Sequence, residues 1–239
     1  MFTAVLQQEV LENVKRLVGW LVFLLAFLVA MSMGLAAVAT AQEASTGAES
    51  AEDYHRITGF RSARFGMTPD EVRAAIQHDF GVSEDAIVPM FNLEQGTLIL
   101  GVAVPSLSPG PGPAQIYYIF GASTGRLMYI NVVWATSEEP TDQERERVVI
   151  AGLQLANYFQ RLRWKPEGAV ANVSVRPGEV VAFAGVDPDN AGVQVIMLGV
   201  PMLDEEGNLV PLEGPSLLQV SYAARFGEPD VTVIEPGSF

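Results

Sequence analysis

Two segments of the chain place apolar residues at helical spacing, and residues 69–80 form the first of them. Thr68 is a suitable N-cap, and Glu71, three residues later, completes a capping box with it. Pro69 occupies the first helical position, where a missing N–H costs nothing. The pattern predicts a helix over 69–80 that ends at Gly81 and buries one face, made of Val72, Ala75, Ile76 and Phe80.

The second helical segment covers residues 142–162 and begins in the same way. Thr141 and Glu144 repeat the capping box, and a polar first turn follows. The apolar positions again share one face: Val148, Leu155, Ala156, Phe159 and Leu162. The sequence therefore predicts a second helix over 142–162.

The remaining apolar runs are rich in β-branched residues and are separated by Gly, Pro and Asp turns, which is typical of strands. The connection ASTG at 122–125 is short enough for a hairpin. Dense apolar content indicates strands that are buried on both faces for part of their length. The predicted strands are 96–107, 114–121, 126–135, 178–186, 192–200 and 216–224.

Each predicted helix precedes three predicted strands, so the chain is a candidate duplication of an α-β-β-β unit. Two well-capped helix starts can also arise independently. Strands joined by hairpins form antiparallel sheet, and helices set before them cover one face, which is the α+β class. The predicted units are 54–136 and 137–239.

The N-terminal region predicts export. Residues 17–38 are almost wholly apolar, follow Lys15 and Arg16, and lead into an Ala-Thr-Ala pattern, so residues 1–41 have the form of a signal peptide. An uncleaved anchor is the alternative, because the apolar run is long enough to cross a bilayer. Residues 42–53 form a flexible acidic tether in either case. Both alternatives place the rest of the chain in the periplasm of a Gram-negative envelope, free or anchored to the inner membrane.

Charge and cysteine content exclude several classes of function. The net charge is −14, so phosphate backbones and anionic membrane surfaces repel the chain, and nucleic acid is not an expected partner. A membrane partner is expected only if residues 17–38 stay attached. The chain has no cysteine, which excludes disulfide scaffolds, thiol catalysis and thiolate metal sites.

No motif predicts a catalytic, cofactor or metal site. A hydrolytic triad needs a histidine, and the chain has only His55 and His78, with no nucleophile elbow around a serine. Asp187 and Asp189 begin like a calcium-binding loop, but position 12 of that loop is Leu198 instead of glutamate. A hairpin turn is the better interpretation of this segment.

Five residues make a candidate partner surface: Arg61, Arg64, Tyr117, Tyr129 and Trp134. The arginines interleave with phenylalanines before the first helix and have the chemistry to bind an acidic partner, although internal pairing in this acidic chain is the simpler interpretation. The aromatic residues lie on hairpin strands, where they form either core pairs or an uncovered binding face.

The helix opening FGMTPDEVRAAI (65–76) resembles that of small envelope proteins of the BamE/SmpA type. A doubled helix-plus-sheet unit resembles proteins like the β-lactamase inhibitory protein. From GFRSARFGMTPDEVRAAIQHDFG to EPGSF, the chain is similar to a group of uncharacterised secreted alphaproteobacterial proteins. These resemblances imply binding and assembly roles, although the lipidated cysteine of the BamE type is missing here.

The sequence thus favours a non-enzymatic envelope protein that binds a protein or a small molecule. Two other hypotheses remain: a periplasmic hydrolase or lyase that uses carboxylates, and an anchored accessory subunit of an inner-membrane complex. A pocket with two close carboxylates of perturbed pKa would favour the enzyme, and an apolar surface would favour binding.

Overall fold

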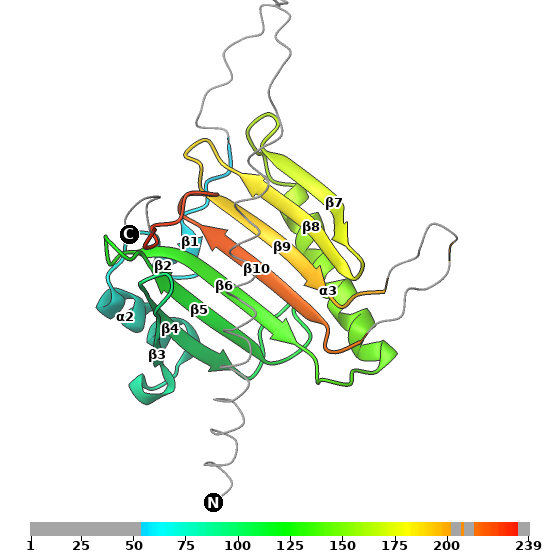
Figure 1. Cartoon of the computed structure of the whole chain (residues 1–239), viewed down its shortest axis with the longest axis horizontal. Helices are drawn as coiled ribbons and strands as arrows, with labels where there is room; N and C mark the ends of the chain where they lie inside the picture. The colour runs from blue at the N-terminus through cyan, green and yellow to red at the C-terminus, as the bar shows by residue number, and fades with distance from the viewer. Residues whose placement is uncertain (1–53, 202–206, 208–212, 234–239) are drawn as a thin grey trace, which may run out of the picture. The chain divides into compact units, whose positions relative to one another are not determined.

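The computed structural model describes residues 54–201, 207 and 213–233 (Figure 1). The predicted signal peptide or anchor at 1–41 and the tether at 42–53 lie outside these residues. Of the helices in the described ranges, none is long and apolar enough to span a bilayer.

Both predicted helices are confirmed, as α2 (Pro69–Phe80) and α3 (Asp142–Gln160). Each begins with the predicted capping box: Glu71 and Glu144 accept a hydrogen bond from the backbone N–H of Thr68 and Thr141, at 2.8 Å in both. Capping satisfies N–H groups that the helix itself leaves without an acceptor. Gly81 then ends α2 in the left-handed conformation, at φ 64°.

Most of the remaining described residues that form regular structure lie in strands, with one short 3-10 turn, η3 (Glu84–Ala86). The predicted strands are confirmed to within a few residues at each end. The strands are β1 (Gly59–Phe60), β2 (Ala63–Arg64), β3 (Val88–Asn92), β4 (Thr97–Val104), β5 (Ala114–Phe120), β6 (Leu127–Ala135), β7 (Ala169–Arg176), β8 (Glu179–Val186), β9 (Gly192–Leu198) and β10 (Leu217–Ala223).

Each helix is followed by four strands of the main sheet, which corrects the predicted α-β-β-β unit. The additional strands are β3 and β7, which form the two edges of the sheet. β3 contains Pro89, which has no N–H to donate to a ladder and is tolerated at an edge. β7 is largely exposed, and its alanines and valines are interrupted by Asn172, Ser174 and Arg176, so no continuous apolar run marks it as a strand.

Eight strands form one antiparallel sheet in the order β3-β4-β5-β6-β10-β9-β8-β7 (Figure 1). The last strand of each predicted unit, β6 and β10, pair with each other, and Val132 lies opposite Val220. The strands of 54–136 and of 137–239 therefore belong to a single continuous sheet. The fold is α+β, with a large antiparallel sheet and two helices.

Both helices pack against the same face of the sheet, α2 near β4 and α3 across β8, β9 and β10 (Figure 1). The main core lies between them and this face. Its largest fully buried strand side chains include Leu100, Ile116, Tyr118, Ile130, Phe183 and Leu218. The short β1–β2 hairpin lies on this face as well, since Phe60 stacks on Tyr222 at 5.4 Å between ring centroids. We call this side the helix face and the opposite side the second face.

Candidate binding face of the sheet

The second face of the sheet carries no charged side chain on its five central strands, β4, β5, β6, β10 and β9. Residues directly opposite one another on neighbouring strands share a face, so the register assigns these positions. They are Thr97, Ile99, Gly101 and Ala103; Gln115, Tyr117 and Ile119; Tyr129, Asn131, Val133 and Ala135; Leu217, Gln219, Ser221 and Ala223; and Gly192, Gln194, Ile196 and Leu198. A solvated sheet face usually carries charged residues, and a chain of net charge −14 has many to place there.

Four polar side chains form a row straight across this face. Tyr117 lies opposite Asn131, Asn131 lies opposite Ser221, and Ser221 lies opposite Gln194. We call these four residues the polar row. At its β4 end, Gly101 lies opposite Tyr117, and a Cβ at that position would lie 2.9 Å from the terminal methyl of Met90.

The centre of the second face is shielded from water, since Tyr117 and Val133 are each only 2% exposed. The two described helices lie on the opposite face and do not provide this shielding. The absence of charged side chains is typical of a sheet face that packs against another surface.

The hydroxyl of Tyr117 is buried and has no hydrogen-bond partner. Burial raises the pKa of Tyr117 to about 12. Buried polar groups in proteins nearly always have a hydrogen-bond partner, so this hydroxyl needs an explanation. Elsewhere on the same face, the Gln219 amide donates to the Ser221 hydroxyl at 2.8 Å. This member of the polar row therefore has a hydrogen-bond partner within the chain.

One end of the second face is covered by the segment that follows β10. The Tyr129 hydroxyl donates to the Arg225 carbonyl at 3.2 Å. Farther along, the Asp230 carboxylate accepts from the hydroxyls of Ser123 and Thr124, at 2.6 and 2.7 Å, and so fixes this segment to the β5–β6 turn. These hydrogen bonds hold the pKa of Asp230 well below its ordinary value.

The five residues of the predicted partner surface lie in three different places in the structure. Tyr117 and Tyr129 lie on the second face, whereas Trp134 lies in the core on the helix face. The indole N–H of Trp134 donates to the Leu107 carbonyl at 3.0 Å, beneath the loop that joins β4 to β5. Arg61 and Arg64 lie on the β1–β2 hairpin, away from the second face.

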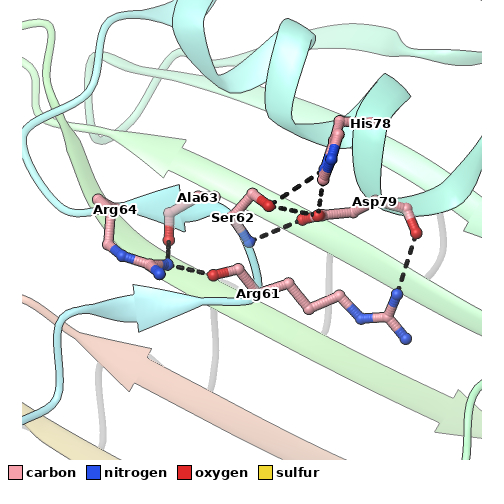
Figure 2. Close-up of polar contacts among 6 residues, drawn as sticks. All are labelled: Arg61, Ser62, Ala63, Arg64, His78 and Asp79. Atoms are coloured by element: carbon pink, nitrogen blue, oxygen red, sulfur yellow. Dashed lines mark hydrogen bonds and ion pairs between the residues drawn. The ribbon is translucent and has the colours of Figure 1, made fainter.

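Arg61 and Arg64 bind carbonyl oxygens rather than carboxylates among the described residues (Figure 2). Arg61 donates to the Asp79 carbonyl at 3.0 Å, and its guanidinium lies 4.7 Å from the centroid of the Phe80 ring. Arg64 donates to the carbonyls of Arg61 and Ala63. Both arginines therefore have partners within the chain, but these partners are carbonyl oxygens, and they join the hairpin to itself and to α2.

Figure 2 also shows Ser62, His78 and Asp79 side by side, a cluster that the sequence did not predict. Ser62 donates its hydroxyl to Asp79 at 2.6 Å and its backbone N–H at 2.9 Å. His78 Nδ1 lies 3.3 Å from the Ser62 hydroxyl and 3.2 Å from the Asp79 carboxylate. In a hydrolytic triad the histidine stands between serine and aspartate and uses both nitrogens. Here the Ser62 hydroxyl donates directly to the Asp79 carboxylate, and the histidine does not stand between them. The cluster therefore joins the hairpin to α2 instead of activating a nucleophile.

The Asp79 carboxylate is expected to stabilise the fold in a pH-dependent way. Burial alone would raise the pKa of Asp79, but the Ser62 and His78 hydrogen bonds bring it below the ordinary value. A lowered folded-state pKa means that the contribution is complete above about pH 4 and is lost as the pH falls through that pKa. We expect Asp79→Asn to lower the free energy of unfolding by about 1–2 kcal/mol at pH 7 and by less at pH 3.

Urea unfolding at both pH values measures this difference. Glu94→Gln, which removes an exposed carboxylate from the β3–β4 turn, is the control and should change stability by less than about 0.5 kcal/mol. Equal losses for Asp79→Asn at pH 7 and pH 3 would contradict the role given to the charge.

The segment 187–191 is a hairpin turn between β8 and β9, as predicted. The buried Asp187 carboxylate accepts from the backbone N–H groups of Ile57, Asp189 and Ala191. These bonds occupy the carboxylate within the fold. More generally, the described part of the chain contains no group of three or more histidine, aspartate and glutamate residues placed to hold a metal ion.

Comparison of the chain with protein-family models, with curated proteins and with solved structures finds no match. The resemblances noted from the sequence therefore stay predictions, and the functional argument rests on the geometry of the second face.

Proposed function

We propose that this chain is a non-catalytic binding protein of the cell envelope, and that its second face binds a protein partner. The supporting observation is a broad sheet face that carries no charged side chain on its five central strands. The export signal predicted for residues 1–41 supports the envelope location.

The extent of the second face favours a protein over a small molecule. Strands lie about 4.8 Å apart and rise about 3.3 Å per residue, so the five central strands, about seven residues each, cover about 550 Å². A typical protein interface buries about 800 Å² on each partner. Small molecules are usually enclosed in a concave pocket, whereas this surface is a sheet face with regular rows of side chains.

The enzyme alternative has less support among the described residues. Every described carboxylate with a shifted pKa has it lowered: Glu71, Asp79, Asp85, Glu144 and Asp230. A carboxylic acid that serves as a general acid needs a raised pKa. The third hypothesis, an anchored accessory subunit, depends on residues 17–38, which lie outside the described residues.

Site-specific photo-crosslinking in cells that make the protein tests the proposal. A photoreactive amino acid is placed at Ser221 or Gln194, two half-buried positions of the polar row, and at Leu153 on the outer side of α3 as control. We expect both positions of the row, but not the control, to yield the same discrete crosslinked protein product. Products from Leu153 alone, or none from the second face, would contradict the proposed binding face.

A further inference from the structure

We propose that the edge strand β3 binds an extended, positively charged segment of a partner protein, which adds to the eight-stranded sheet as a further strand. Within the described sheet, β3 pairs with β4 on one side and with no strand on the other (Figure 1). Strand addition of this kind draws its affinity from main-chain hydrogen bonds. The edge is a different surface from the second face, so the inference goes beyond the proposed function and is tested separately.

The exposed side chains of β3 and of the turn after it are large and apolar. Phe91 is 59% exposed, and Leu93 is 87% exposed. Val88 adds a third exposed apolar side chain at the start of the strand. Apolar groups of this size on an unpaired edge favour contact with another chain.

The other edge of the sheet, β7, is protected in ways that β3 is not. Asn172 has a left-handed backbone, at φ 55°, and the register of β7 with β8 shifts between Ser174 and Arg176. Irregular backbone and charged side chains are devices with which proteins block strand addition. In contrast, β3 keeps a regular register with β4 from Val88 to Asn92 and carries no charged residue.

Pro89 determines which backbone groups of β3 face outward. Opposed residues of antiparallel strands alternate between pairs that exchange two hydrogen bonds and pairs that exchange none. Pro89 lies opposite Leu100 and has no N–H to donate, so this pair is of the second kind. Phe91, two residues farther along and opposite Leu98, belongs to the same kind. The N–H and C=O of Phe91 therefore point away from β4, toward an added strand.

Negative charge at both ends of β3 determines the kind of segment that fits. Glu84 and Asp85 precede the strand, Glu94 follows it, and all three are exposed. Arg73 of α2 pairs with Glu84, and no lysine, arginine or histidine occurs from residue 79 to residue 125. The edge therefore attracts a positively charged segment and repels an acidic one.

The test uses a defined probe, the end-blocked peptide KVTVTVK, which alternates apolar and polar positions and carries a positive charge at each end. It is added to the whole chain as purified from its producing cells, and exchange of backbone amide hydrogens is followed by NMR. We expect the Phe91 amide to exchange quickly in the chain alone and at least about tenfold more slowly with the peptide bound. The same peptide methylated on every internal backbone nitrogen has no main-chain donor and should bind at least about tenfold more weakly.

An acidic peptide, EVTVTVE, tests the charge preference. It should bind at least about tenfold more weakly than KVTVTVK at roughly 0.05 M salt. The difference should shrink at roughly 0.5 M salt, because salt screens charges at an exposed edge. Equal binding of the two peptides at the lower salt would contradict the positive charge given to the partner.

Matched variants place the peptide on β3. Val88→Lys adds a positive charge to this edge and should weaken binding of KVTVTVK at least about fivefold. Val170→Lys makes the same change on β7, at a valine of similar exposure, and should leave binding unchanged. Phe91→Pro removes the outward N–H, whereas Phe91→Ala keeps it, so the proline variant should bind at least about threefold more weakly than the alanine variant. Circular dichroism of each variant checks that the fold is retained.

Three results of the exchange experiment would overturn the inference. A Phe91 amide that exchanges slowly in the dilute chain alone would show that the same chain already pairs with this edge. Slow exchange that appears only as the chain concentration rises would make a second copy the occupant. Binding of KVTVTVK that leaves the exchange of Phe91 unchanged would place the peptide elsewhere on the protein.

Discussion

Trp134→Ala is expected to lower the free energy of unfolding by about 3–5 kcal/mol. The indole is 3% exposed and belongs to the core beneath the helix face. It also holds the β4–β5 loop, because its N–H donates to the Leu107 carbonyl and its ring lies close against Gly110. Alanine would leave a large cavity and an unsatisfied carbonyl together.

Urea unfolding followed by circular dichroism measures this loss, with Tyr158→Ala as control. Tyr158 is an aromatic residue on α3 that is 57% exposed, so its truncation should cost less than about 1 kcal/mol. Had Trp134 been part of a partner surface, as the sequence suggested, its replacement would leave stability nearly unchanged. Comparable stability of the two variants would contradict the position found here.

The helices could be predicted almost to the residue because their signals are local. Thr68 and Glu71 lie within one turn of each other, and the capping box they form depends on nothing farther along the chain. The same holds for Thr141 and Glu144. The end of α3 has no such local signal: the helix ends at Gln160 without a glycine, two residues before the predicted end.

The edge strands could not be predicted because tertiary context decides them. The residues of β7 are mostly exposed, and β7 becomes a strand by pairing with β8. β3 likewise pairs only with β4 and contains a proline that argues against a strand. Strand propensity reflects packing on neighbours more than an intrinsic preference of the backbone.

The polar row could not be predicted from the sequence, and the reason is different. Tyr117 and Tyr118 are adjacent tyrosines in a strand with apolar residues on both faces, so periodicity does not show which of them faces the helices. The row also joins residues from β5, β6, β10 and β9, and only the register of the sheet brings them into line. Tyr117 and Tyr129 were proposed as surface candidates from residue type alone, and their common face follows from the fold.

Gly152→Val is expected to lower the free energy of unfolding by about 3 kcal/mol, because α3 touches the sheet at this glycine. A Cβ at position 152 would lie 2.2 Å from the Met197 sulfur and 3.4 Å from a methyl carbon of Leu218. Both neighbours are buried, so α3 must move away from β9 and β10. Gln154→Val introduces the same side chain on the exposed side of α3 and should cost only about 0.5 kcal/mol.

A double variant separates overpacking from a loss of helix propensity. Met197→Ala removes the side chain that the new valine meets first, at the cost of a cavity when it is made alone. If steric conflict is the cause, Gly152→Val with Met197→Ala should be more stable than the sum of the two single losses predicts, by about 1 kcal/mol or more. Additive losses would show that the valine destabilises the protein through its low helix propensity alone. A clash between position 152 and β9 would then not be the cause.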